Sequence, residues 1–288
     1  LIFMVLKRKF IRQGIRISLK PKLNLLKESY PFATIALLSV FLYQSEVVIL
    51  KHFHGNASTG IYGVALALYS GLIFVIANFG SAAFPSFVRS FNMSKDRLKE
   101  NFEKSLRLLF IIAFPIAIGG ILLSDKIVGV FYGSQYTGSA LCLKILFPAL
   151  FLHYFGTFFA TLLLSVKMEK LGMKILFYTV LMTIAADFLL IPRFDFIGAS
   201  IVRLSANLLL AVFTWLAIHK NIFAPDIFKK LLKPVLAGLI MAAVLLLLAG
   251  GNLFIAVTAG ILTYFASLFL MREFNLAEYD FIAAFIKG

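Results

Sequence analysis

Residues 44–65 read QSEVVILKHFHGNASTGIYGVA and join the end of one apolar segment to the start of the next through a short polar turn. One carboxylate, Glu46, lies within the otherwise apolar run, and GIYGVA (60–65) opens the second segment with small residues around a tyrosine. Apolar segments joined by a tight polar turn are typical of a helical hairpin in lipid. Much of the remaining chain repeats this pattern.

The composition places the chain in a membrane. It is 61% hydrophobic and 14% charged, with a mean hydropathy of +0.96, whereas soluble domains are nearer half apolar and a quarter charged. The single cysteine, Cys142, allows no disulfide framework. The sequence contains no GxxxxGK[ST], HExxH or GxSxG motif and only short loops on the side expected to be external, so we expect a protein that is not an enzyme.

A bilayer core of about 30 Å needs roughly 20 apolar residues per helix. Eight segments meet this requirement: 29–50, 60–84, 105–123, 139–166, 175–191, 198–218, 231–249 and 253–271. Because backbone polar groups in lipid need internal partners, and because the segments do not alternate with period two, they predict helices rather than barrel strands. The predicted fold class is an all-α, polytopic membrane helix bundle.

The basic residues predict the orientation. The net charge is +15, and 23 of the 28 lysines and arginines fall in segments that share one side: 1–28, 85–107, 167–174, 219–233 and 272–288. Short loops rich in Lys and Arg stay cytoplasmic, so we expect a multi-pass protein of the cytoplasmic membrane with its C-terminus inside. These charges then meet anionic membrane lipid, and no nucleic-acid partner is predicted.

The two ends suggest the domain organisation. Residues 1–28 begin with LIFMVL rather than Met and continue into a basic amphipathic run, which favours the end of a preceding helix followed by an interfacial linker, or a simple connector. We therefore expect an N-terminal portion to be missing. Residues 272–288 have the pattern of an amphipathic tail, with a simple connector again the alternative. Between them lie the eight predicted helices.

Ionisable groups inside a membrane cost about 2.5–3.5 kcal/mol each on insertion scales, so they need partners or a wet cavity. Glu46 is either a carboxylate that reaches the headgroups or a cavity-lining proton or cation site. Lys144 either snorkels to the outer face or faces a substrate. Asp187 and Arg203 flank a short connection at similar depth, which predicts an ion pair between them, with Arg203 gripping an anionic substrate group as the alternative.

The other polar candidates are weaker. His153 lies near the middle of its segment, as a neutral histidine bonded to a neighbouring helix or as a proton-coupling group. Asn78 and Asn207 are polar companions within segments. His52 and His54 are two residues apart and lack further ligands, so no metal site is predicted.

Several stretches, taken in order, are similar to one family. After a basic linker and Pro31 come SEVVILKHFHGNASTGIYGVA (45–65), FPSFVRS (84–90), SLRLLFIIAFPIAIG (105–119), FYGSQYTGSALCLKIL (131–146) and DFLLIPRFDFIGASIVRLSANLL (187–209). Together they resemble the C-terminal half of the polysaccharide and O-antigen flippase branch of the multidrug/oligosaccharidyl-lipid/polysaccharide (MOP) superfamily. The family often has Asn where Asp187 stands, and an acidic residue where Glu46 stands.

The resemblance implies a fold of two six-helix lobes around a central cavity. Residues 29–219 are then the second lobe, the pair 220–271 is an addition that some members carry, and the missing first lobe, in the same parent chain or in a split partner, is an expected partner. The implied function is flipping a polyprenyl-diphosphate-linked oligosaccharide across the cytoplasmic membrane for polysaccharide export by alternating access. Alternatives are a cation-coupled multidrug antiporter of the same fold, or a membrane glycan polymerase or glycosyltransferase.

The resemblance also assigns expected roles to the polar residues. The residues expected to bind substrate are Arg203, Lys144, Arg89, Asn78 and Tyr43. The residues expected to couple transport to an ion are Glu46, Asp187 and His153. No cofactor is expected beyond a coupling Na⁺ or H⁺.

Overall fold

A computed structural model describes residues 23–248 and 250–273, except for the side chains of 23–28, 75–78 and 228–229. Nearly all of the predicted interfacial linker and tail lies outside these residues. Within them the chain is helical and has no strands. In chain order the elements are α2 (Leu23–Met93), α3 (Lys95–Phe131), the short η1 (Ser134–Tyr136), α4 (Thr137–Ser165), α5 (Glu169–Asn221), α6 (Phe228–Leu247) and α7 (Leu253–Leu270).

The two longest elements, α2 and α5, are hairpins. Six of the described helices are long and apolar enough to cross a membrane. Both α2 and α5 consist of two helical arms that meet at one non-helical residue. In α2 that residue is Gly55, with φ 74° and ψ −163°, and in α5 it is Asp195, with φ 53° and ψ −137°. The four arms and the other four helices match the eight predicted segments, so the fold class is confirmed.

The predicted polar turn at 51–59 is wrong in extent. The helix continues on both sides of the reversal, and only Gly55 leaves it. Glycine adopts this positive-φ conformation without a Cβ clash, so a single residue turns the chain where the sequence pattern indicated a loop. Asp195 also reverses the chain at a positive φ, although it has a Cβ. Side-chain contacts at the hairpin tip hold its strained backbone in place.

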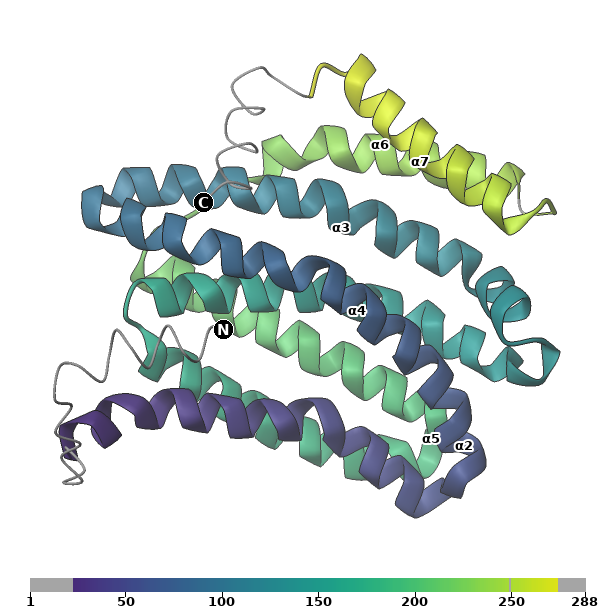
Figure 1. Cartoon of the computed structure of the whole chain (residues 1–288), viewed down its shortest axis with the longest axis horizontal. Coiled ribbons are helices and arrows are strands. Elements are labelled where there is room, and N and C mark those ends of the chain that lie inside the picture. Colours follow the sequence, from purple (N-terminus) through teal and green to yellow (C-terminus); the bar gives the residue numbers. More distant parts are fainter. Residues whose placement is uncertain (1–22, 249, 274–288) are drawn as a thin grey trace, which may run out of the picture.

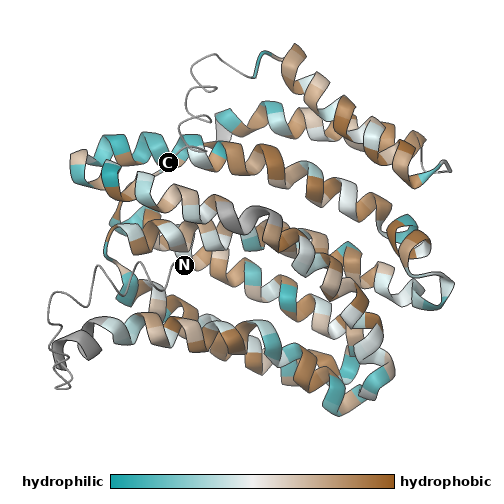
Figure 2. Cartoon of the chain, viewed as in Figure 1, coloured by the Kyte–Doolittle hydropathy of each residue, from teal (hydrophilic) through white to brown (hydrophobic). Residues whose placement is uncertain are grey.

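The helices lie side by side, and the chain reverses at alternate ends of the bundle (Figure 1). We call the end that holds Ser94, residues 166–168 and residues 222–227 the basic end, and the end that holds Gly55, Gly133 and Asp195 the hairpin end. Hydrophobic residues dominate the middle of the helices, whereas polar residues gather toward both ends (Figure 2). This distribution is that of a multi-pass membrane protein.

Buried apolar side chains form two clusters. The larger cluster joins α2, α4 and α5 with part of α3. The smaller one contains Met241, Leu245 and Tyr264, and packs α6 and α7 against α3. Figure 1 shows α6 and α7 beside α3, on the far side of the bundle from the first arm of α2. The boundary predicted at residue 220 stays a prediction.

Close packing at Gly198 holds the α5 hairpin shut. A Cβ at this position would lie 2.6 Å from the carbonyl oxygen of Leu190 and 3.1 Å from the Cα of Ile191, both on the opposite arm. Backbone atoms cannot move aside as a flexible side chain does, so only glycine fits. The two arms of α5 are therefore fixed close together just below Asp195, and this sets the depth of the polar groups on each arm.

Candidate functional site

A buried ion pair lies between the first arm of α2 and the second arm of α5. The guanidinium of Arg203 contacts the carboxylate of Glu46, and the two side chains are 3% and 1% exposed. The same Nη2 atom donates to the carbonyl oxygen of Tyr43 at 2.9 Å. Glu46 also accepts a hydrogen bond from the Tyr62 hydroxyl at 3.2 Å. Removing both charges from water costs free energy, which the attraction of the pair and its additional hydrogen bonds offset.

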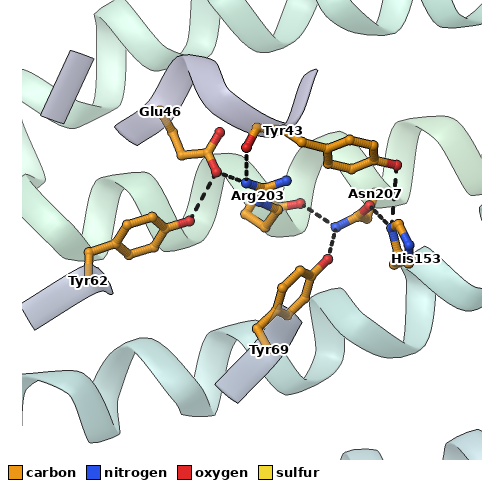
Figure 3. A network of polar contacts seen from close by, with 7 residues as sticks. All are labelled: Tyr43, Glu46, Tyr62, Tyr69, His153, Arg203 and Asn207. Atoms are coloured by element: carbon orange, nitrogen blue, oxygen red, sulfur yellow. Dashed lines mark hydrogen bonds and ion pairs between the residues drawn. The ribbon is translucent and has the colours of Figure 1, made fainter. Parts of the chain in front are cut away.

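Aromatic rings surround the guanidinium. The Cζ atom of Arg203 lies 5.2 Å from the ring centroid of Tyr43 and 5.8 Å from that of Tyr69. A cation over an aromatic face is attracted by the ring quadrupole. Figure 3 shows these side chains converging from the two arms of α2 and from α5. The arginine is thus held by one carboxylate, one carbonyl and two rings.

Asn207 and His153 extend the network toward α4. The amide nitrogen of Asn207 lies 3.1 Å from the Tyr69 hydroxyl and donates to the Arg203 carbonyl at 3.0 Å. Its amide oxygen lies 3.3 Å from Nδ1 of His153, and the Tyr43 hydroxyl lies 3.4 Å from the same nitrogen. Three helical elements therefore contribute to one continuous polar chain (Figure 3).

Asp187 lies close to this network but is not part of it. Its side chain is completely buried, and the Ser45 hydroxyl, next to Glu46 in the chain, lies beside its carboxylate. Neither carboxylate oxygen has a hydrogen bond of good geometry to the described residues. Burying a polar group without a hydrogen-bond partner costs free energy, so these two carboxylate oxygens are free to bind a ligand.

A cavity of about 250 Å³ adjoins the network on the side of His153. It lies between the second arm of α2, α3 and α4. The polar side chains at its wall are His153, Tyr154, Thr157, Thr161 and Ser81, and the rest of the wall is apolar apart from the backbone at Gly80. His153 belongs both to the polar chain and to the cavity wall, so the cavity reaches the polar network at the histidine.

The hairpin tips form a second polar cluster. The Ser58 hydroxyl donates to Asp195 at 2.8 Å, and Nδ1 of His54 lies 3.7 Å from the same carboxylate. His54 also contacts the carbonyl of Ile191 at 2.9 Å. These contacts tie the α2 tip to the α5 tip. The described residues include no group of three or more potential metal ligands.

The predicted site residues fall into two sets. The structure brings Tyr43, Glu46, His153 and Arg203 together and places Asp187 beside them. Lys144 lies apart from this group, because its partly exposed ammonium pairs with the exposed Asp125 of α3 at 2.7 Å. Arg89 is exposed toward the basic end of α2. The side chain of Asn78 lies outside the described residues.

The predicted ion pair between Asp187 and Arg203 is wrong. The two residues lie eight positions before and after Asp195, at the similar depth expected, but Arg203 pairs with Glu46 instead. Depth follows from position along the hairpin, whereas the partner depends on which helix packs against each face. The alternative of Glu46 as a carboxylate reaching the headgroups is also excluded, because its arm continues to His54 and its side chain is buried.

Sequence reasoning gave Tyr62, Tyr69 and Asp195 no role. Tyr62 is the tyrosine of the GIYGVA stretch. A tyrosine among small residues is the one sequence feature that could have marked it as a member of the site. Tyr69 follows seven residues later on the same face of the arm, the spacing of two helical turns. Nothing local to Asp195 marks it as the hinge of α5.

These features define a class: a multi-pass membrane protein of paired helical hairpins that keeps an ionised polar network inside its bundle. Intramembrane ionisable groups of this kind are typical of transporters.

Comparison with known proteins agrees with this class. A family model described as "Polysaccharide biosynthesis protein" matches residues 1–141. The capsular polysaccharide biosynthesis protein CapF of Staphylococcus aureus is 25% identical over 181 residues, which are 61% of this chain and 44% of CapF. The lipid II flippase MurJ, in an inward closed conformation, superposes with a TM-score of 0.74 at 17% identity, over 94% of this chain and 59% of MurJ.

The comparisons confirm the predicted resemblance. The superposition shows that this chain shares its fold with part of MurJ, and the family model and CapF show similarity to polysaccharide biosynthesis proteins. This chain spans less than half the length of CapF and about three fifths of MurJ.

Proposed function

We propose that the chain acts in a transporter that flips a polyprenyl-diphosphate-linked oligosaccharide across the cytoplasmic membrane. The carrying observation is the ionised network of Glu46 and Arg203 inside a MOP-type bundle. The similarity to polysaccharide biosynthesis proteins supports a lipid-linked sugar as the load. A transporter is favoured over an enzyme because the protein that shares this fold, MurJ, is a flippase. The relative found by sequence, CapF, is a polysaccharide biosynthesis protein.

The proposed orientation places the basic end in the cytoplasm. The segments 85–107, 167–174 and 219–233 all lie at this end and carry most of the described lysines and arginines, and such segments are retained inside. The C-terminus is then cytoplasmic. The load is collected at the basic end and released at the hairpin end, where Lys144 and Asp125 lie.

The Glu46–Arg203 pair suggests how anion and proton binding are coupled. In the closed pair the two charges satisfy each other. When Glu46 takes a proton, Arg203 loses its counter-ion and becomes a site for the diphosphate, because a guanidinium can donate two parallel hydrogen bonds to two phosphate oxygens. A proton therefore binds to Glu46 together with one anionic group that binds to Arg203, and the net charge inside the bundle does not change.

The remaining predicted residues take supporting roles in this proposal. Tyr43 and His153 orient the guanidinium and give the network a path to the cavity. Asp187, buried without strong partners, is a second coupling site for H⁺ or Na⁺. Arg89 at the basic end, with Asn78 and Lys144, contacts the substrate on its way.

Depletion of the protein in cells that need it for surface polysaccharide tests the function. We expect surface polysaccharide to fall and the lipid-linked oligosaccharide to accumulate on the inner leaflet, where it is inaccessible to an added glycosidase. Unchanged polysaccharide with no accumulation contradicts the proposal. Accumulation of single, unpolymerised repeats on the outer leaflet indicates a polymerase instead.

The ion-coupling role has its own test. Asp187→Asn removes a buried carboxylate, whereas Asp96→Asn is a control at an exposed aspartate of the same chain. We expect export by the Asp187 variant to lose its dependence on the ion gradient, measured with ionophores that collapse ΔpH or the Na⁺ gradient. Equal gradient dependence in both variants removes Asp187 from the coupling mechanism.

A further inference from the structure

A groove of about 680 Å³ lies between the two arms of α5 at the basic end. Tyr178 and Met182 of the first arm and Phe213 and Leu216 of the second form its apolar walls. It lies at the opposite end of the hairpin from Asp195. The groove is therefore separate from the buried Glu46–Arg203 network.

The groove opens on an apolar face. Phe177, Tyr178, Leu181 and Met182 are 51%, 58%, 58% and 47% exposed, and Leu216 across the groove is 56% exposed. Large apolar side chains with this exposure on a membrane-spanning hairpin face hydrocarbon. The walls suit acyl chains in composition and in position along the helix.

Two lysines stand at the mouth of the groove. Lys174 is near the start of the first arm, and Lys220 is at the end of the second, so both lie where α5 leaves the apolar layer. Both are exposed, no carboxylate lines the groove, and neither lysine has an ion pair among the described residues. Two unneutralised cations above an apolar groove complement an anionic headgroup above acyl chains.

We propose that this groove binds an anionic phospholipid of the bilayer, with its headgroup phosphate between Lys174 and Lys220 and its acyl chains along Tyr178, Met182 and Leu216. Basic pockets between membrane helices bind such headgroups. The assignment of this lipid to the cytoplasmic leaflet depends on the orientation proposed above. The binding of the lipid does not depend on the proposed transport function.

Native mass spectrometry of the purified chain tests the site. Dioleoyl-phosphatidylglycerol and dioleoyl-phosphatidylcholine are titrated separately, so that only the headgroup differs. The groove variant is Lys174→Gln/Lys220→Gln. The control, Lys104→Gln/Lys170→Gln, removes the same charge from exposed lysines that do not line the groove. Met182→Trp fills the groove and keeps both lysines.

We expect the wild-type chain to bind phosphatidylglycerol about tenfold or more tightly than phosphatidylcholine, and the groove variant to lose that preference. The control keeps the preference, and Met182→Trp weakens binding of both lipids at the first site. Equal affinity for the two lipids in the wild type overturns the proposal, as does an equal loss in groove and control variants. Displacement of phosphatidylglycerol by equimolar undecaprenyl diphosphate assigns the groove to the polyprenyl lipid and also overturns it.

Discussion

Two charged clusters in this chain are built on opposite principles. The Glu46–Arg203 pair lies inside the bundle with both side chains buried. The cluster at the basic end places Glu103 against Lys230, and Glu273 against Arg107 and Lys233. There the carboxylates are buried, but Lys230 and Lys233 are each 48% exposed. Their ammonium groups keep part of their hydration.

This difference in burial suggests that the basic-end cluster holds helices together, whereas the interior pair has a role in transport. The basic-end cluster joins α3 to α6 and to Glu273, which lies three residues after the end of α7. Its partly exposed lysines lower the desolvation cost. Replacing a buried ion pair by well-packed apolar residues is often neutral or stabilising, so stability alone does not account for the interior pair, and we propose that it serves transport. Removing single groups from each cluster measures this difference.

The largest effect is expected for Arg203→Met. The substitution leaves the Glu46 carboxylate buried without its cation, and breaking a buried pair in this way costs about 3–5 kcal/mol of unfolding free energy. Thermal unfolding of the purified chain in detergent measures the loss. The double variant Glu46→Met/Arg203→Met recovers most of it. A single variant as stable as the wild type contradicts the pairing.

Tyr62→Phe is expected to have an intermediate effect. It removes only the 3.2 Å hydrogen bond to Glu46, and a hydrogen bond to a charged group contributes about 1.5–3 kcal/mol. Export is expected to fall as well, because Glu46 loses one of the contacts that position it beside Arg203. Tyr264→Phe is the matched control, since the Tyr264 hydroxyl is buried without a described hydrogen-bond partner. Equal losses in the two variants speak against a role for the Tyr62 hydroxyl.

Glu103→Gln is expected to cost less, about 1 kcal/mol. The variant loses the ion pair with Lys230, but an amide oxygen still accepts from the Asp226 backbone NH, which lies 2.9 Å from Glu103 in the wild type. Limited proteolysis of the 222–227 link reports on detachment of α6. Export stays at the wild-type level. A loss of export at normal protein levels would assign the basic-end cluster to transport as well.

Lys144→Gln is expected to have the smallest effect on stability. Its pair with Asp125 is exposed, and exposed pairs contribute about 0–1 kcal/mol. The apparent melting temperature, measured beside that of Arg203→Met, separates the two cations that sequence reasoning treated alike. A shift as large as that of the Arg203 variant would mean that Lys144 is buried in the working protein.

Segment length and charge distribution were sufficient to predict the architecture. A run of about 20 apolar residues has few options in lipid, so residues 60–84 or 198–218 can be assigned as spans without a structure. The turns were less predictable. Gly55 alone reverses the chain in α2, and Asp195 alone reverses it in α5. Nothing in the residues around either position marks that one residue as the point of reversal.

The ionisable members of the site were predictable from the sequence, but two of its tyrosines and the contacts between its members were not. Glu46, His153 and Arg203 stood out because charge is rare in apolar segments. Which of them meet depends on helix rotation and on the packing of α2 against α5, and these follow from many small apolar contacts. The partner of Arg203 was therefore misassigned to Asp187, and Tyr69, which is unremarkable in sequence, was missed.

Export by the double variant Glu46→Met/Arg203→Met tests the central claim most directly. This variant keeps a packed interior but has no charge at either position. In cells that rely on this protein, surface polysaccharide is measured at membrane levels matched to the wild type. The account predicts a folded protein with export lost. A double variant that is folded and exports at the wild-type rate would show that the buried pair serves the structure alone.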